Sequence, residues 1–370
     1  MIRATPFHAR TAELNRANRW TTRDGITLAA AYDDADHEAA AARFGVIVAD
    51  ISWRWRLTME GARVREMVQR LFTRDAAPLL PGQALKALWL SDGGGVRGAG
   101  VISRHGRQAF QLTAATTDAA WFEDAAQLFG VTLHDLTGQE GGLALIGPYA
   151  AKLLATLGID PALEPLHFHQ QEWRGFPLTL ARFGEHNGYE IWCEAEHALY
   201  LWDRIAAAGA HFALVPAGVE AVDTLDLEAG VPRPGRDYDG AHDPHAAGPL
   251  PGELRLGTLV EAEQGFNGRA AALTAQPKRR LAGIVLDSDV SAPFASLLRD
   301  GQVVGRALSS RYSPVLRRAI ALAQIDLAHA SAGTRLSLML PPSRDVFLPT
   351  VAAATVVDLP FLPAPDAVGP

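Results

Sequence analysis

The clearest candidates for chemistry lie around one predicted turn, in the segment ARFGEHNGYEIWC (181–193). Glu185 and Glu190 flank a His-Asn-Gly sequence, with Arg182 and Tyr189 close by in the chain. Carboxylates beside a hairpin turn are usually solvated. They can also accept charge-assisted hydrogen bonds from a guanidine-like heterocyclic edge, in which an amino group neighbours a ring N–H. The segment is therefore a candidate ligand site, with an exposed turn as the alternative.

A second candidate is the alternating sequence Trp53, Arg54, Trp55 and Arg56. It predicts a strand on which the tryptophans share one face and the arginines share the other. An arginine can hold a carboxylate with its planar fork, and a tryptophan can cover an apolar ligand. Trp53 and Arg54 are therefore candidate substrate-binding residues. An amphipathic strand without a binding role is the alternative.

Two other patterns favour structure over chemistry. Five glycines between 93 and 100 precede a strand, with no GK[ST] sequence, so they predict a tight hairpin and no phosphate loop. Two histidine pairs lack a supporting carboxylate pattern, so we expect no metal. These pairs are His167 with His169, and His242 with His245.

The elements that must position these residues alternate without a regular βαβ rhythm, which predicts an α+β fold. Apolar or alternating runs predict strands at 44–52, 55–61, 84–92, 109–116, 143–147, 176–184 and 188–194. Apolar residues at helical spacing predict helices at 62–72, 120–130, 148–158 and 197–209. Residues 232–257 are rich in proline, glycine, histidine and aspartate and predict a long loop. After Lys278 only strand patterns remain, which indicates a small β-barrel.

Composition narrows the functional classes. A chain of 370 residues is long enough for two or three domains. Its 34 basic and 41 acidic residues give a net charge of −7, so no basic field attracts a nucleic acid. The single cysteine, Cys193, excludes an intrachain disulfide. The most apolar segment, 142–158, is interrupted by Gly147, Pro148 and Lys152, and the amino terminus lacks the apolar stretch of a signal peptide. We expect a cytoplasmic protein that binds neither membranes nor nucleic acids.

Seven segments, in order along nearly the whole chain, resemble the glycine cleavage T-protein family, the folate-dependent aminomethyltransferases and their demethylase relatives. The segments are AYDDADHEAAAARFGVIVADIS, LSDGGGVRGAGVISR, LALIGPYAAKLL, RFGEHNGYEI, VEAVDTLDLEAGVPRPGRDYD, GFNGRAAAL and VVGRALSSRYSPVLRRAIALAQID. They are similar to family motifs that include N-E-x-G-G-x-x-D-D, G-Y-T-G-E-x-G-Y-E-I and A-R-D-x-L-R-L-E-A-G.

The resemblance implies a particular fold and cofactor. We expect mixed-sheet folate-binding domains around a central hole, followed by a C-terminal β-barrel. Residues 1–276 would form the folate-binding region, built from two ferredoxin-like subdomains, and 277–370 the barrel domain. The implied cofactor is tetrahydrofolate.

The resemblance also implies a folate site. Glu185 matches the glutamate that holds the pterin, although one extra residue in the turn would let His186 take that position. Glu190 matches the second acidic position, and Tyr189 the aromatic residue between the two. The candidate cofactor-binding residues are Glu185, Glu190, Arg182, Lys86 and Trp89.

Departures from the family pattern bear on the reaction. The aminomethyltransferases carry an aspartate after the double glycine, where this chain has Gly98 and Ala99. The family's tyrosine before that hairpin falls at Lys86, and the arginine of A-R-D falls at Val222. Without the aspartate, no group assists attack by the folate N5 on an aminomethyl adduct. A methyl group on oxygen, sulfur or nitrogen transfers directly to N5, so a demethylase mainly aligns donor and acceptor and protonates the leaving group. Tyr189 is the candidate acid.

These departures favour a tetrahydrofolate-dependent demethylase. It would move a methyl group from a small, carboxylate-bearing O-, S- or N-methyl compound to N5 of tetrahydrofolate. One alternative is an aminomethyltransferase of the glycine-cleavage type. Another is a non-catalytic folate-binding factor for iron–sulfur assembly, a branch with K-G-C-Y-x-G-Q-E where this chain has GFNGRAAAL. The expected partner is the small-molecule methyl donor.

Overall fold

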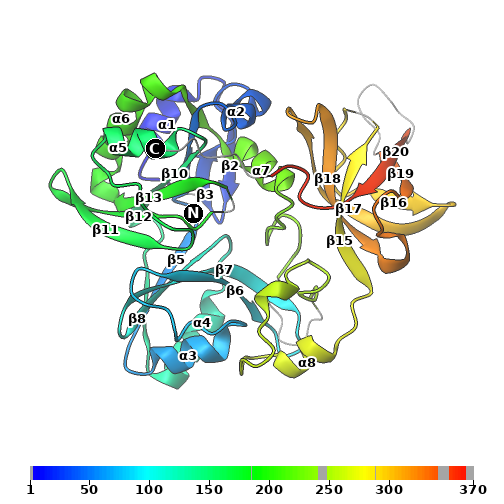
Figure 1. Cartoon of the computed structure of the whole chain (residues 1–370), viewed down its shortest axis with the longest axis horizontal. Coiled ribbons are helices and arrows are strands. Elements are labelled where there is room, and N and C mark those ends of the chain that lie inside the picture. Colours follow the sequence, from blue (N-terminus) through cyan, green and yellow to red (C-terminus); the bar gives the residue numbers. More distant parts are fainter. Residues whose placement is uncertain (1–2, 185, 241–247, 288, 341–349, 364–370) are drawn as a thin grey trace. The chain divides into compact units, whose positions relative to one another are not determined.

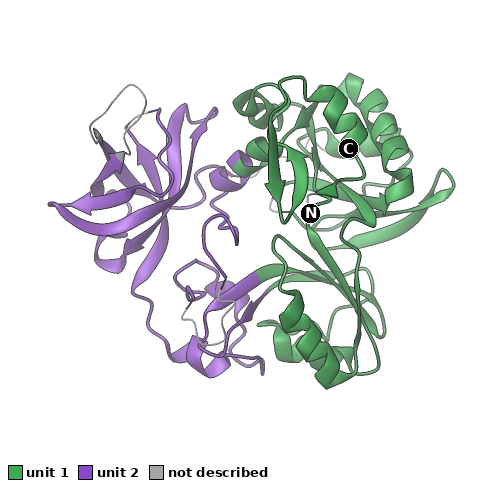
Figure 2. Ribbon diagram, turned by 180° about the vertical axis from the view of Figure 1, so that it is seen from behind, with its two compact units in different colours: residues 1–87, 99–223, 364–370 green, residues 88–98, 224–363 purple. Residues whose placement is uncertain are grey.

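The computed structural model describes residues 3–184, 186–240, 248–287, 289–340 and 350–363. Contacts divide the chain into two compact units (Figure 2). Unit 1 comprises 1–87, 99–223 and 364–370, and unit 2 comprises 88–98 and 224–363. The units are defined by contacts alone, and the expected domain boundary at 276/277 stays a prediction. Leu227, in the helix α7 (Val219–Glu228), clusters with the barrel residues Leu281, Ile320 and Leu322.

A six-stranded sheet organises unit 1, in the order β11-β12-β13-β10-β4-β14 (Figure 1). Its strands are β11 (Phe168–Trp173), β12 (Phe176–Ala181), β13 (Gly188–Glu194), β10 (Glu140–Ile146), β4 (Val46–Asp50) and β14 (Leu214–Ala217). Two helices contribute to the apolar core on one face of this sheet, α5 (Ala150–Thr156) and α6 (Ala198–Gly209). Phe7, the N-cap residue of α1 (His8–Leu14), joins the same core. Successive side chains on a strand point to opposite faces, so alternate residues of β13 either join this core or emerge on the other face.

A five-stranded sheet has the order β6-β7-β8-β5-β9. Its strands are β6 (Ala84–Leu90), β7 (Val96–Gly106), β8 (Ala109–Ala114), β5 (Trp55–Glu60) and β9 (Thr132–Asp135). Trp55 packs edge-on against Phe122 of α4 (Ala119–Phe129), and Phe122 contacts Phe72 at the end of α3 (Val64–Leu71). The helix-covered face of β5 is therefore apolar.

A smaller sheet and a short helix complete unit 1. The sheet has the order β1-β3-β2, formed by β1 (Arg3–Ala4), β3 (Ile26–Ala29) and β2 (Trp20–Arg23). Helix α2 (Ala35–Ala41) is capped by the Asp34 side chain, which accepts from two backbone N–H groups.

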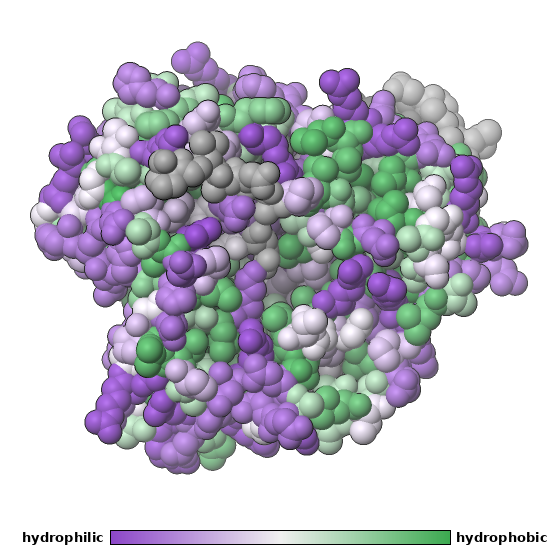
Figure 3. All heavy atoms as spheres, viewed as in Figure 1, coloured by the Kyte–Doolittle hydropathy of each residue, from purple (hydrophilic) through white to green (hydrophobic). Residues whose placement is uncertain are grey.

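Unit 2 contains a closed barrel in the order β15-β18-β17-β16-β19-β20 (Figure 1). Its strands are β15 (Arg279–Leu286), β18 (Arg318–Asp326), β17 (Gln302–Ser313), β16 (Ser296–Arg299), β19 (Arg335–Leu340) and β20 (Thr350–Val357). The short helix α8 (Arg269–Thr274) precedes the barrel. Apolar residues are also present on the outer surface shown in Figure 3, and exposed barrel residues include Val303 and Met339.

The fold class expected from the sequence, mixed sheets followed by a β-barrel, is confirmed. The strand expected at 188–194 has those bounds in β13, and the helix expected at 120–130 is α4, which ends at the left-handed Gly130. The central hole stays a prediction. Among the described residues, no helix combines the length and hydropathy needed to cross a membrane.

Candidate active site

Glu190 lies in the middle of the six-stranded sheet, on the face opposite the helices. On β13, Ile191 and Cys193 belong to the helix-covered core, so Glu190 and Trp192 emerge on the other face. The residues beside Glu190 on the neighbouring strands are Ala144 and Ala181. Neither of these small side chains can donate a hydrogen bond to the carboxylate.

Two planar N–H donors hold the Glu190 carboxylate. Arg54 donates from Nη1 to Oε1 at 2.5 Å, and Trp192 donates from Nε1 to Oε2 at 3.4 Å. Glu190 is only 3% exposed, and the Arg54 side chain is 13% exposed. The pair thus joins a candidate cofactor-binding residue to a candidate substrate-binding residue. Nε of Arg54, the guanidinium nitrogen next to the aliphatic part of the side chain, is buried without a hydrogen-bond partner among the described residues.

A turn after β4 brings Arg54 to this position. Asp50 accepts from both the backbone N–H and the hydroxyl of Ser52, at 3.0 and 2.7 Å, and Arg54 donates its N–H to the Ile51 carbonyl. The prediction that Trp53 and Arg54 belong to a strand is wrong, since β5 begins at Trp55. A side-chain hydrogen bond to the local backbone competes with strand pairing, and here Asp50 stabilises the turn.

The tryptophans of this segment have separate surroundings. Trp55 is almost fully buried in the core beneath α4, whereas Trp53 lies in the turn. The Arg23 guanidinium carbon is 5.8 Å from the Trp53 ring centroid, and Arg23 also pairs with Asp223 at 2.7 Å. Trp53 therefore contacts a cationic side chain, and its role toward a substrate stays a prediction.

Arg56 supports the Glu190 site from the five-stranded sheet. Its guanidinium carbon lies 4.0 Å from the centroid of the Trp192 ring, and its Nε is 2.8 Å from Glu140 Oε2. Its Nη2 also donates to Gln111 Oε1 at 2.9 Å. Burial raises the pKa of Glu140, and the Arg56 charge opposes that rise. Arg56 therefore ties the two sheets of unit 1 together behind the Glu190 carboxylate.

A glycine makes room for Trp192. Gly142 pairs with Trp192 across β10 and β13, and a Cβ on Gly142 would lie 2.3 Å from the indole. The glycine thus lets the indole lie over β10, where it can be covered by Arg56 and can donate to Glu190. Sequence reasoning missed Trp192 and Glu140. The alternation of side chains along a strand could have indicated Trp192, because it is two residues beyond Glu190 and therefore lies on the same face of the sheet.

The structure separates Tyr189 from Glu190. Tyr189 packs against the helix-covered core, and its hydroxyl donates to the Pro161 carbonyl at 3.0 Å. Arg182 lies beside it, with its guanidinium carbon 5.6 Å from the Tyr189 ring centroid and Nη1 donating to the Leu163 carbonyl. Because adjacent residues on a strand face opposite ways, this geometry does not support the prediction that Tyr189 acts as an acid beside Glu190.

Lys86 and Trp89 lie on β6, three residues apart, so they occupy opposite faces of that strand. Trp89 is fully buried. A Cβ built on Gly98 would lie 2.1 Å from Trp89 Cζ2 and 2.6 Å from Cε2. The Trp89 indole thus fills the space that a side chain at position 98 would need.

The structure assigns no ligand-binding role to four of the residues considered from the sequence, nor a catalytic role to the single cysteine. Glu185, His242 and His245 lie outside the described residues. His167 has both ring nitrogens near protein atoms, the Pro165 carbonyl and the Gln83 amide. Burial raises the pKa of the Cys193 thiol to about 12, so this cysteine is a poor nucleophile.

One group of described residues brings potential metal-ligand atoms within 4.8 Å of one another: Glu194, Glu196 and His197. The two glutamates are exposed, and His197 stacks on Phe176 with ring centroids 4.3 Å apart. Exposed acidic groups of this kind are common without a metal, so we assign no metal to the trio.

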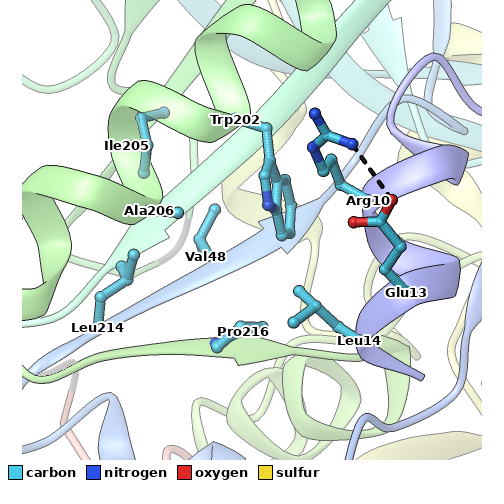
Figure 4. Close-up of a pocket in the computed structure, with 9 residues that line it drawn as sticks. All are labelled: Arg10, Glu13, Leu14, Val48, Trp202, Ile205, Ala206, Leu214 and Pro216. Carbon is cyan, nitrogen blue, oxygen red and sulfur yellow. Dashed lines mark hydrogen bonds and ion pairs between the residues drawn. The ribbon is translucent and has the colours of Figure 1, made fainter. Parts of the chain in front are cut away.

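A separate cavity of about 190 Å³ lies beside α1, α6 and β14 (Figure 4). Its apolar walls include Trp202 and Leu214, and Arg10 at its rim is paired with Asp203 and Glu13. Pockets for drug-sized ligands typically measure about 300–1,000 Å³. A folate is too large for this cavity, so we do not assign the folate to it.

Comparisons with known proteins agree with this architecture. The GCVT N-terminal domain family matches residues 7–249, and the glycine cleavage T-protein C-terminal barrel domain matches residues 279–362. The chain belongs to the glycine cleavage T-protein family. The two matches confirm the family expected from the sequence. Members of this family act with tetrahydrofolate.

Similar proteins carry different names. An aminomethyltransferase of Geobacillus kaustophilus is 31% identical over 339 residues, which cover 88% of this chain and 89% of that protein. A trimethylamine-oxide aldolase of Ruegeria pomeroyi is 28% identical over 362 residues, covering 91% of this chain and 45% of that protein. The solved structure of the glycine cleavage system aminomethyltransferase T from Bartonella henselae matches with a TM-score of 0.86 at 23% identity, covering 98% of both chains. This last similarity supports the fold alone.

Proposed function

We propose that this protein transfers a methyl group from a small O-, S- or N-methyl compound to tetrahydrofolate. The observation that carries the proposal is the contact between Gly98 and Trp89. Where aminomethyltransferases of the family carry an aspartate, this chain has a glycine, and a fully buried indole lies 2.1 Å from the place of its missing Cβ. The hairpin is thus packed without the carboxylate on which aminomethyl transfer relies.

The described residues fit the pterin of a folate. Glu190 already accepts from the planar N–H groups of Arg54 and Trp192 on the face of the sheet opposite the helices. The amino and ring N–H edge of a pterin has the same donor geometry as a guanidinium. Glu190 would hold that edge, and Trp192 with Arg56 would fix the orientation of the carboxylate. Glu185 is the second proposed pterin-binding residue, from the family resemblance.

When bound, tetrahydrofolate supplies N5 as the methyl acceptor. The bond between the methyl carbon and the oxygen, sulfur or nitrogen of the donor breaks, the new bond to N5 forms, N5 loses its proton and the leaving atom gains one. The protein contributes alignment of the two reactants, which can supply about 7–11 kcal/mol of the barrier reduction. The network from Arg56 through Trp192 to Glu190 serves that alignment because its groups are buried and mutually held.

Aminomethyl transfer is the second candidate function. The Geobacillus kaustophilus relative bears the name aminomethyltransferase and aligns over 88% of this chain. This function is disfavoured because the chain has Gly98 and Ala99 at the positions where the family's aminomethyltransferases carry acidic residues. The trimethylamine-oxide aldolase relative shows that family members are not all named for aminomethyl transfer.

The deciding experiment compares the two reactions directly. Purified protein is incubated with tetrahydrofolate and methoxy, methylthio and N-methyl acids, and 5-methyltetrahydrofolate is measured by chromatography. In parallel, ammonia release is measured from an aminomethylated lipoyl carrier. We expect methyl transfer with at least one donor class and no ammonia. Ammonia release without methyl transfer would establish the second candidate, and tetrahydrofolate binding without either reaction would favour a non-catalytic folate-binding role.

A further inference from the structure

The Arg54–Glu190 pair joins two side chains that the proposed function assigns to different ligands. Nη1 of Arg54 pairs with Glu190 Oε1 at 2.5 Å, while Nε of Arg54 is buried without a hydrogen-bond partner among the described residues. A guanidinium carries five N–H donors in a planar fork. A buried donor without a partner is uncommon in proteins and indicates a group that a ligand can satisfy.

A pterin and Arg54 compete for the same carboxylate. The amino and ring N–H edge of the pterin would need Glu190 Oε1, which Arg54 holds. Separating a buried ion pair is unfavourable, since each charge loses its counter-charge in a poorly solvated place. Trp192 donates to the other oxygen of Glu190 at 3.4 Å, and this contact does not involve Arg54. The neighbouring Arg56 keeps its own partner, Glu140, at 2.8 Å.

We propose that Arg54 exchanges partners during binding. A carboxylate of the methyl donor takes the guanidinium through Nε and a neighbouring N–H, while Glu190 Oε1 accepts from the pterin edge. This inference rests on the proposed function and names the donor as an anionic compound. Either ligand binding alone would leave one charge of the separated Arg54–Glu190 pair without a partner. When both ligands bind, each charge has a partner, so the anionic donor and tetrahydrofolate bind cooperatively. Linkage requires each ligand to raise the affinity of the other by the same factor.

Binding measurements without turnover test the exchange. Calorimetry under anaerobic conditions gives the Kd of tetrahydrofolate and, separately, of 6-methyltetrahydropterin, which lacks the carboxylates of the folate tail. Each titration is repeated with saturating benzoate, and with benzamide as the neutral match. We expect benzoate to lower both Kd values by about 5- to 150-fold, the usual range of coupling between sites, and benzamide to leave them unchanged.

Three variants assign the coupling to Arg54. Arg54→Gln should abolish the benzoate effect. Arg54→Lys keeps a positive charge beside Glu190 but lacks Nε–H and the planar fork, so tetrahydrofolate should bind as in the wild type while the benzoate effect falls. Arg63→Gln is the matched control, because Arg63 is exposed on the protein surface and pairs with Glu66. The thermal unfolding midpoint of each variant shows that it is folded, and Arg54→Lys carries the test if Arg54→Gln is not.

Three results would overturn the exchange: equal effects of benzoate and benzamide, no effect of benzoate on the wild type, or an undiminished effect in Arg54→Gln. Benzoate competing with tetrahydrofolate but not with the pterin would also overturn it, by placing Arg54 on the folate tail. These outcomes are distinct from failure of the proposed function. Coupled binding without any methyl transfer would support the exchange of partners and refute the proposed reaction. Methyl transfer without coupled binding would support the proposed reaction and refute the exchange.

Discussion

Replacing Gly98 by alanine tests whether the Trp89 indole occupies the place of a side chain at position 98. The new Cβ would lie 2.1 Å from Trp89 Cζ2, whereas carbon atoms in contact are separated by about 3.5–4.0 Å. Trp89 is fully buried, so the indole can move only by displacing its neighbours. Overpacking of this kind costs about 1–3 kcal/mol. We expect Gly98→Ala to lower the free energy of unfolding by at least that amount.

Chemical denaturation of the wild type, Gly98→Ala, Trp89→Ala and the double variant measures the contact. Removing a buried tryptophan costs about 3–5 kcal/mol by itself. In the Trp89→Ala background the Gly98→Ala change meets no indole and should cost little, which leaves a coupling of about 1–3 kcal/mol between the two sites. Strictly additive effects, or a Gly98→Ala variant as stable as the wild type, would refute the packing argument and the functional proposal that depends on it.

The same position tests the reaction. Gly98→Asp introduces the carboxylate of the aminomethyltransferases, but the chain also departs from their pattern at Lys86 and Val222. We expect a destabilised protein that releases no ammonia from an aminomethylated lipoyl carrier. Ammonia release by this variant, with none by the wild type, would show that one missing carboxylate separates the two activities.

Three further predictions concern the site. Glu190→Ala should weaken tetrahydrofolate binding about ten- to a hundredfold, since charge-assisted hydrogen bonds contribute about 1.5–3 kcal/mol, and unchanged calorimetric affinity would remove the pterin from Glu190. Tyr189→Phe should leave kcat for methyl transfer unchanged, because the hydroxyl donates to the Pro161 carbonyl, and a large loss of kcat would restore Tyr189 as the acid. Burial and the Arg56 charge lower the pKa of His105 to about 4 in the folded protein, whereas a histidine in the unfolded chain has a pKa of about 6.5. Between these two pH values, the unfolded chain binds a proton that the folded protein does not bind. Stability should therefore fall by about 3 kcal/mol as the pH falls through that window, and His105→Phe should flatten the dependence of stability on pH. An identical pH dependence in both proteins would count against a neutral His105 in the folded protein.

Local patterns predict much of the fold because they depend on neighbouring residues along the chain. Alternating residues predict β13 with its observed bounds, and helical spacing with a terminal glycine predicts α4 and its end at Gly130. The same reasoning fails at Trp53 and Arg54. Their sequence alternates as in a strand, but the Asp50 side chain bonds to Ser52 and holds a turn there.

The sequence by itself determined the family, the α+β fold with its barrel, and Glu190 as a candidate ligand-binding carboxylate. Tertiary structure alone decided which residues meet. Arg54 and Glu190 are 136 residues apart in the chain. Their ion pair depends on the order β13-β10-β4 in one sheet and on the turn that follows β4. Tyr189 and Glu190 are adjacent in the chain, yet the pleat of β13 directs them to opposite faces. The loss of an aspartate at Gly98 is visible in the sequence, but the indole that fills its place is not, because Trp89 reaches it through space across the hairpin.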